Sequence, residues 1–183
     1  AGLERFPESW GLHDRLRREY DRLALVVAQI AEVEAIRDAI AAAPPPADPQ
    51  AEQIVRLAKL KAVGCQTATV LAREVFWRAF DNRRQLGSYL GMTPTPWRSG
   101  AMVREQGISK AGNPRARTVA IELAWMWLRW QPDSALSKWF RDRVGAAKGR
   151  ARRIAIVALA RKLLIALWRY LTTGLVPDGA VLK

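Results

Sequence analysis

The fold is decided by the segment between residues 50 and 75, which reads QAEQIVRLAKLKAVGCQTATVLAREV. In its first half, apolar residues such as Ile54 and Leu57 recur every three or four positions, as on one face of a helix. A turn at Gly64 interrupts the pattern, and a second apolar face continues to Val75. The segment therefore predicts two helices joined by a tight turn.

Further helical segments follow with the same spacing. They cover about residues 81–89, 113–130, 132–144 and 148–173. Asp48-Pro49 and Asn113-Pro114 each place a capping side chain before a proline, which is a favoured helix start. The longest stretch without a helical pattern runs from Gly91 to Gly112 and is rich in glycine and proline. We therefore predict an all-α fold.

A long helix with a coiled-coil seam is predicted for residues 9–43. Apolar residues alternate along it at spacings of three and four, among them Leu16, Leu23, Val26 and Ile30. Such a seam is typical of self-association, although a helix packed on its own domain would show a similar stripe. We expect a coiled-coil arm at 1–43, a stiff proline-rich linker at 44–49 and a helical domain at 50–183.

Positive charge is concentrated in the second half of the chain. The chain holds 30 Lys and Arg against 17 Asp and Glu, a net charge of +13. Residues 98–169 contain 16 basic and 4 acidic residues, whereas residues 1–97 are nearly neutral. A surface that serves solubility alone mixes the two signs, so the excess favours a polyanionic partner, nucleic acid before an anionic membrane. Arg161 and Lys162 at the middle of the last helix argue against a membrane span.

The use of cysteine and histidine excludes several kinds of site. Cys65 and His13 are each the only residue of their type. The chain therefore has no disulfide framework, no metal site built from Cys or His, and no catalytic His near the basic half. It begins at Ala1 without a signal-peptide pattern, so we expect a piece of a longer intracellular protein.

Two features suggest contacts with phosphate. The turn at Gly64 resembles a helix-hairpin-helix element, in which backbone N–H groups meet a phosphate, although a plain helical hairpin fits equally well. Lys110, Arg115 and Arg117 surround the predicted helix start at Asn113, where backbone donors, the helix dipole and cations converge on an anion. An ordinary capped helix with solvated cations would give the same pattern.

A third feature is a serine in the glycine- and proline-rich stretch. Ser99 precedes Gly100 in a predicted loop between basic residues, where a hydroxyl is free to approach a nucleic-acid backbone. Tryptophan could also contact nucleic acid by stacking on bases. However, Trp125, Trp127 and Trp130 cluster on one predicted helix among apolar neighbours, which favours packing over base stacking.

The order of these motifs resembles the C-terminal domain of the insertion-sequence 110 (Piv/MooV-like) transposases. The resemblance covers about residues 54–124. Beside the helical hairpin it rests on Gln85-Leu86-x-x-Tyr89-Leu90-Gly91-x-x-Pro94, Ser99-Gly100 and Gly107-Ile108-Ser109-Lys110-x-Gly112-Asn113-x-x-x-Arg117. The sequence departs from the family pattern at Cys65, Arg98 and Ala111, and Cys65 weakens the phosphate-clamp hypothesis.

The resemblance implies that Ser99 is the nucleophile in DNA cleavage and exchange, with Ser109 as the competing hydroxyl. It also implies a coiled coil and, before it, a RuvC-like domain whose four carboxylates would hold Mg²⁺. We therefore expect no cofactor in this chain and no activity from this chain alone. Some members of the family are RNA-guided, which makes a guide RNA a candidate partner beside DNA. The implied location is the bacterial cytoplasm, at the nucleoid.

The sequence thus predicts the C-terminal part of a DNA transposase or recombinase that self-associates through its coiled coil. The residues expected to contact DNA are Gly64, Arg98, Gly100, Arg104, Ser109, Lys110, Gly112, Asn113, Arg115 and Arg117. One alternative is a non-catalytic helix-hairpin-helix module that binds DNA and is dimerised by the coiled coil. A structural RNA-binding protein is the other.

Overall fold

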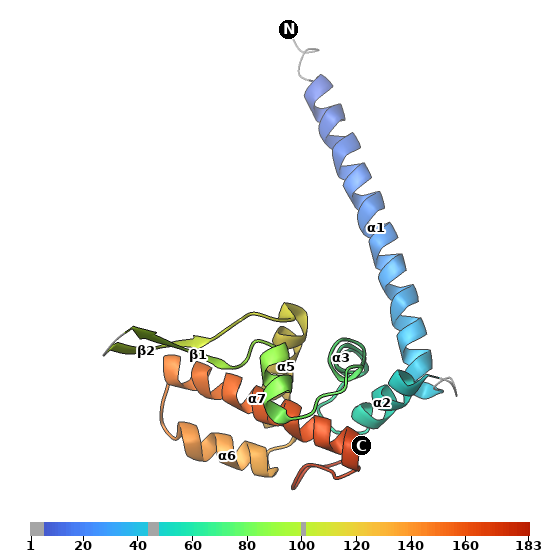
Figure 1. Cartoon of the computed structure of the whole chain (residues 1–183). Coiled ribbons are helices and arrows are strands. Elements are labelled where there is room, and N and C mark those ends of the chain that lie inside the picture. Colours follow the sequence, from blue (N-terminus) through green and yellow to red (C-terminus); the bar gives the residue numbers. More distant parts are fainter. Residues whose placement is uncertain (1–5, 44–47, 100–101) are drawn as a thin grey trace. The chain divides into compact units, whose positions relative to one another are not determined.

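The computed structural model describes residues 6–43, 48–99 and 102–183, and it describes side chains for residues 11–43, 48–95 and 107–183. The chain divides into two compact units, Ala1–Ala39 and Ile40–Lys183. Most residues of the predicted linker, 44–47, lie outside the described residues. Within the described ranges the fold is helical apart from one two-stranded sheet, which confirms the predicted fold class (Figure 1).

The first unit contains helix α1 (Phe6–Ala42) up to Ala39, and the long helix confirms the prediction. Residues of the predicted seam are exposed along it: the exposed fraction is 58% for Leu16, 59% for Leu23 and 51% for Ile30. A helix with a continuous apolar stripe is usually covered along that stripe. The coiled coil itself stays a prediction.

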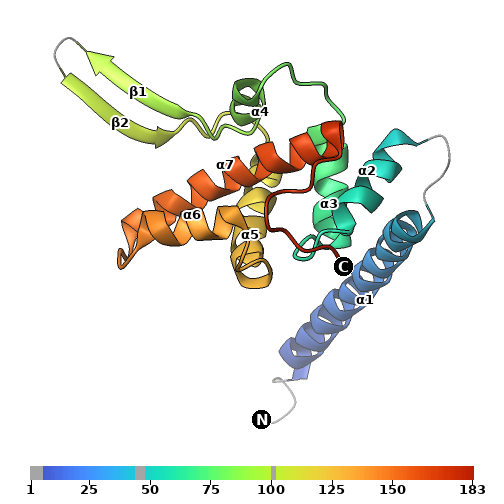
Figure 2. The ribbon, with the colours of Figure 1, turned by 90° about the horizontal axis from the view of Figure 1, so that it is seen from below.

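The second unit contains the remaining helices of the described chain. They are α2 (Pro49–Ala58), α3 (Cys65–Leu71), the π-helix η1 (Ala72–Phe76), α4 (Arg83–Tyr89), α5 (Pro114–Trp130), α6 (Ala135–Val144) and α7 (Arg150–Thr173). Helix α7 packs against α5, α6, α2 and α4 (Figure 2). Its apolar face, including Leu159 and Leu163, is fully buried together with Leu57, Leu71 and Trp127. These residues form the core that holds the second unit together.

Two helix starts follow the predicted pattern of a capping side chain before proline. Asp48 Oδ1 accepts hydrogen bonds from the backbone N–H groups of Gln50 at 2.9 Å and Ala51 at 3.2 Å. Asn113 Oδ1 accepts one from Ala116 N at 3.1 Å. These hydrogen bonds confirm both predicted helix starts. Such starts can be predicted from the sequence because an N-cap depends only on neighbouring residues.

The glycine- and proline-rich stretch contains a β-hairpin that we did not predict. Strands β1 (Pro94–Ser99) and β2 (Met102–Ile108) pair antiparallel, with an irregular register between the two prolines of β1. Ser99, expected in a loop, is the last residue of β1 and lies opposite Met102. Proline usually argues against a strand because it cannot donate to the ladder. In a two-stranded sheet each strand has a free edge, where proline is tolerated.

The C-terminal tail pairs with the turn between α2 and α3. Residues 181–183 pair with residues 59–61 through backbone hydrogen bonds. The buried Gln131 joins both segments, since its Nε2 donates to Lys61 O at 2.7 Å and to Val181 O at 2.8 Å. Its Oε1 accepts from Val181 N at 2.8 Å. One side chain therefore links the turn, the tail and the end of α5.

Candidate nucleic-acid interface

Two glycines allow the segments on either side of the hairpin to lie close together, next to the start of α5. Gly91 (φ +64°) and Gly112 (φ +131°) have backbone conformations that other residues rarely adopt. A Cβ atom on Gly91 would lie 2.2 Å from Ala111 O, and one on Gly112 would lie 2.2 Å from Tyr89 O. The segments before and after the hairpin approach each other this closely because both positions lack a side chain.

Ser99 lies at the outer end of this hairpin. Its pairing with Met102 is the last of the ladder, and the pairs Arg98–Val103 and Trp97–Arg104 precede it. Figures 1 and 2 show the two strands extending away from the helices of the second unit. Gly100 and the side chains of Arg98, Ser99 and Arg104 lie outside the described residues, so their predicted contacts with DNA stay predictions.

Below the strands, the hairpin is tied to the helical body by backbone hydrogen bonds and one arginine. Ser109 N and Lys110 N donate to carbonyl oxygens of the preceding segment at 2.9 and 3.0 Å. Nη1 of Arg117 donates to Leu90 O and to Lys110 O, both at 3.1 Å. The Arg117 guanidinium, which we predicted at a phosphate, thus binds carbonyl oxygens of this chain. The Lys110 side chain is exposed.

A carboxylate from η1 lies beside the start of α5. Glu74 Oε2 accepts a hydrogen bond from Asn113 Nδ2 at 2.9 Å, and Glu74 Oε1 lies 3.0 Å from Nη1 of Arg115. Tyr89 supports this arrangement by donating its hydroxyl to the backbone oxygen of Glu74 at 2.9 Å. An external phosphate near Asn113 and Arg115 stays a prediction. The structure places an internal anion next to both.

The turn before α3 is open on its outer side. Gly64 is the N-cap of α3, is exposed, and has nothing within 4 Å of the position where a Cβ would lie. Lys59 and Lys61 are exposed on the same turn. This geometry permits the close approach of a phosphate that a helix-hairpin-helix element requires, and the role of Gly64 in DNA binding stays a prediction.

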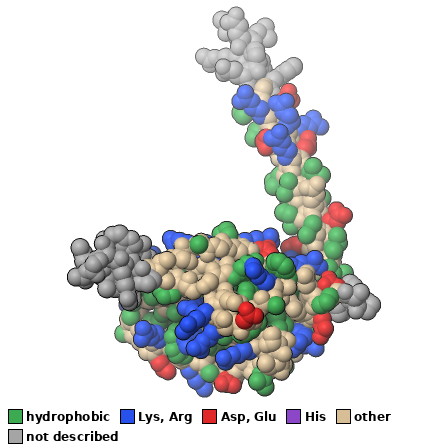
Figure 3. Space-filling view, in the orientation of Figure 1, with side chains coloured by type: hydrophobic (Ala, Val, Ile, Leu, Met, Phe, Trp, Pro, Cys, Tyr) green, Lys and Arg blue, Asp and Glu red, His purple; other side chains and the backbone are tan. Residues whose placement is uncertain are grey.

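A dense set of basic side chains lies on α6, α7 and the loop between them, with Asp142 as the one acidic residue of that segment. They are Lys138, Arg141, Arg143, Lys148, Arg150, Arg152, Arg153, Arg161, Lys162 and Arg169. The ion pairs found among the described side chains involve none of them. Figure 3 shows Lys and Arg side chains across the visible face of the second unit. Unpaired cations of this density suit a phosphate backbone.

The tryptophans of α5 divide into one buried and two partly exposed residues. Trp127 is fully buried and donates its Nε1–H to Ser134 Oγ at 2.9 Å, so the packing interpretation is right for this residue. Trp125 is 39% and Trp130 42% exposed. The guanidinium of Arg152 lies over the Trp125 ring, 5.2 Å from its centroid, which stabilises this side chain at the surface.

No group of three or more His, Cys, Asp or Glu side chains among the described residues is placed to hold a metal ion. None of the helices described has the length and apolarity needed to cross a membrane.

The sequence of residues 55–138 matches the family described as Transposase IS116/IS110/IS902 family. The chain belongs to this transposase family. The matched region runs from the end of α2 through α3, the β-hairpin with Ser99 and α5, and it includes nearly all of the motifs that carried the resemblance.

Two similar proteins come from Sinorhizobium fredii (strain NBRC 101917 / NGR234). The chain is 49% identical over 178 residues to the protein named "Putative transposase y4rJ", an alignment that covers 94% of this chain and 45% of that protein. It is 29% identical over 139 residues to "Putative transposase y4qE", covering 63% of this chain and 35% of that protein. The chain therefore spans less than half the length of these relatives.

Proposed function

We propose that the chain is the C-terminal part of a DNA transposase or recombinase, which binds DNA and contributes Ser99 as the nucleophile. The observation that carries the proposal is the position of Ser99 at the outer end of a hairpin whose base is fixed by Gly91 and Gly112. A hydroxyl so placed can reach a strand outside the helical body.

The proposed reaction conserves the energy of the phosphodiester. Ser99 Oγ attacks a DNA phosphorus, an Oγ–P bond forms, and the bond from phosphorus to the 3′ oxygen breaks. The serine hydroxyl gives up its proton in this step, and the 3′ oxygen takes up a proton and leaves as a hydroxyl, so no net proton is gained or lost. The resulting 5′-phosphoserine can then be attacked by another 3′ hydroxyl, which rejoins the strands and releases the serine.

Activation of the hydroxyl is assigned to the rest of the protein. Serine needs a base or a metal to become a strong nucleophile. Glu74, the carboxylate described beside the hairpin base, is already paired with Asn113 and Arg115. The described residues also offer no ligand set for a metal. We propose that the expected Mg²⁺ would be held by carboxylates of the RuvC-like domain that the resemblance implies, and no step above uses it.

The basic side chains of α6 and α7 are the proposed surface for the DNA backbone. They carry most of the charge excess of residues 98–169 and form no ion pair among the described residues. Arg98 and Arg104 would stabilise the phosphate under attack. The exposed seam of α1 supports self-association. The proposed setting is the bacterial nucleoid, with a guide RNA as a further candidate partner.

A non-catalytic DNA-binding module is the second candidate. The open turn at Gly64 favours it, because a phosphate contact there needs no serine chemistry. The two functions are separated in the longer protein by comparing Ser99→Ala with Ser109→Ala. We expect Ser99→Ala to lose the covalent protein–DNA adduct and keep DNA affinity, while Ser109→Ala keeps both. If the wild type and both variants bind DNA but none of them forms an adduct, the protein is a non-catalytic DNA-binding module.

A further inference from the structure

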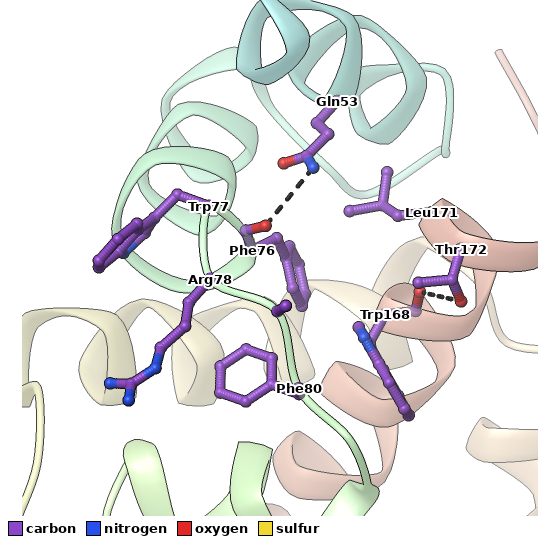
Figure 4. A pocket seen from close by; sticks show the side chains of 9 residues that line it. Gln53, Phe76, Trp77, Arg78, Phe80, Trp168, Leu171 and Thr172 are labelled. Carbon is purple, nitrogen blue, oxygen red and sulfur yellow. Dashed lines mark hydrogen bonds between the residues drawn. The ribbon is translucent and has the colours of Figure 1, made fainter.

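One pocket in the second unit has no part in the serine chemistry. It has a volume of about 350 Å³ and lies between α2, the end of η1, the residues that follow it and the end of α7 (Figure 4). Its lining includes Gln53, Trp77, Arg78, Phe80 and Trp168. Pockets that bind small ligands begin at about 300 Å³. The space is therefore large enough for one planar ring system.

Four of the nine residues that line the pocket are aromatic, namely Phe76, Trp77, Phe80 and Trp168. Phe80 and Trp168 are half-buried, whereas Trp77 is 55% exposed. Figure 4 shows the Gln53 amide at one end of the pocket and the Phe80 and Trp168 rings at the other. The half-buried Phe80 and Trp168 rings offer flat apolar surface on which a planar group can stack, and the exposed Trp77, which also lines the pocket, adds a further ring.

The Gln53 amide is incompletely satisfied. Its Nε2 donates to Phe76 O at 3.4 Å, a long hydrogen bond, and its buried Oε1 has no partner among the described residues. Buried polar atoms without a partner are rare in folded proteins. Phe76 ends the π-helix η1, and single π-turns are frequent at functional sites. A weakly held amide can turn into the pocket and pair with a ligand that offers both a donor and an acceptor.

We propose that this pocket binds one unstacked base of a single-stranded nucleic acid. The inference rests on the proposed function, in that it takes DNA as the partner, and adds a second kind of contact to it. The base stacks against the aromatic wall, its hydrogen-bonding edge meets the Gln53 amide, and the exposed Arg78 attracts the adjoining phosphate. An apolar side chain of another polypeptide would fill the same space but leave Gln53 Oε1 without a donor.

The test measures the affinity of the 183-residue chain for three DNA probes. They are a 12-nucleotide thymidine strand, the same strand with abasic sites, and a 12-base-pair duplex. A uridine strand tells DNA from RNA as the source of the base. The variants are Gln53→Leu, Trp77→Ala and Trp77→Phe. Tyr20→Ala removes an exposed aromatic ring from the other unit and serves as the control. Thermal unfolding of each variant confirms that it folds.

We expect the thymidine strand to bind more tightly than the abasic strand. Trp77→Ala should weaken its binding by at least about 5-fold, the low end of the effect of one base stacked on an aromatic ring. Gln53→Leu should weaken it by a smaller factor, Trp77→Phe should restore most of the loss, and duplex affinity should not change in any variant. A 5-iodouracil strand should cross-link to the peptides 74–78 or 79–83.

Three results would overturn the proposal, and a fourth would overturn the proposed function. If the thymidine and abasic strands bind equally, or if Trp77→Ala acts no differently from Tyr20→Ala while the duplex still binds, the pocket takes no base and DNA binding stands. Cross-links confined to other peptides lead to the same conclusion. If neither the duplex nor the single strands bind at low salt, the proposed DNA-binding function itself is wrong.

Discussion

Replacing Gly112 with alanine tests whether the glycine pair fixes the hairpin to the helical body. The new Cβ would lie 2.2 Å from Tyr89 O, so the two segments must separate by about 1 Å to reach van der Waals contact. The hydrogen bond from Asn113 N to Tyr89 O, 3.3 Å long, would then be lost at about 1 kcal/mol. The φ of +131° adds roughly 1–3 kcal/mol for a residue with a side chain. We therefore expect Gly112→Ala to lower the free energy of unfolding by about 2–4 kcal/mol in total.

Gly107→Ala provides the matched control for this substitution. Gly107 also has a positive φ, +87°, but nothing lies within 4 Å of its Cβ position. Gly107→Ala should therefore lower the free energy of unfolding by about 1–2 kcal/mol, which is the cost of a positive φ alone. Denaturant unfolding followed by tryptophan fluorescence measures both variants, since the buried Trp127 reports on the second unit. Equal losses for Gly112→Ala and Gly107→Ala would show that the close contact with Tyr89 does not hold the hairpin.

Three other predictions concern the arm, the tail and the basic surface. Leu23→Asp places a charge in the predicted seam and should dissociate the chain in sedimentation velocity; a wild-type monomer at high concentration would instead show that the seam serves no self-association. Gln131→Leu should lower the free energy of unfolding by about 2 kcal/mol, because Lys61 O and Val181 N lose their partner; an unchanged midpoint contradicts its linking role. Replacing both Arg152 and Arg153 with glutamine should reduce the slope of log affinity for duplex DNA against log salt by about 0.9 for each phosphate contact that is lost. An unaltered slope would show that the DNA binds elsewhere.

The parts of the fold that depend on neighbouring residues were predictable. Asp48 and Asn113 start helices where the cap-then-proline pattern places them, and apolar spacing locates α7. The hairpin was not predictable, because Pro94 and Pro96 hide the strand pattern and pairing across a turn leaves no periodic signal. The contacts of Gln131 join segments far apart in the sequence, which no local pattern encodes.

The same division holds for the site. The motif order around Ser99 identified the family because it depends on the sequence alone. The partner of Asn113 is Glu74, 39 residues earlier, and only the fold brings them together. The two carbonyl oxygens that Nη1 of Arg117 binds belong to a hairpin base that the sequence does not reveal, and the contact of Arg117 with DNA stays a prediction.

The central claim, that Ser99 forms the covalent bond to DNA, is tested most directly by locating the adduct on the protein. The longer protein is incubated with its DNA, denatured, and digested with nuclease and protease, and the peptides that retain a nucleotide are sequenced by mass spectrometry. We predict a 5′-phosphonucleotide on the hydroxyl of Ser99. A nucleotide on Ser109, or on any residue outside β1, would contradict the claim.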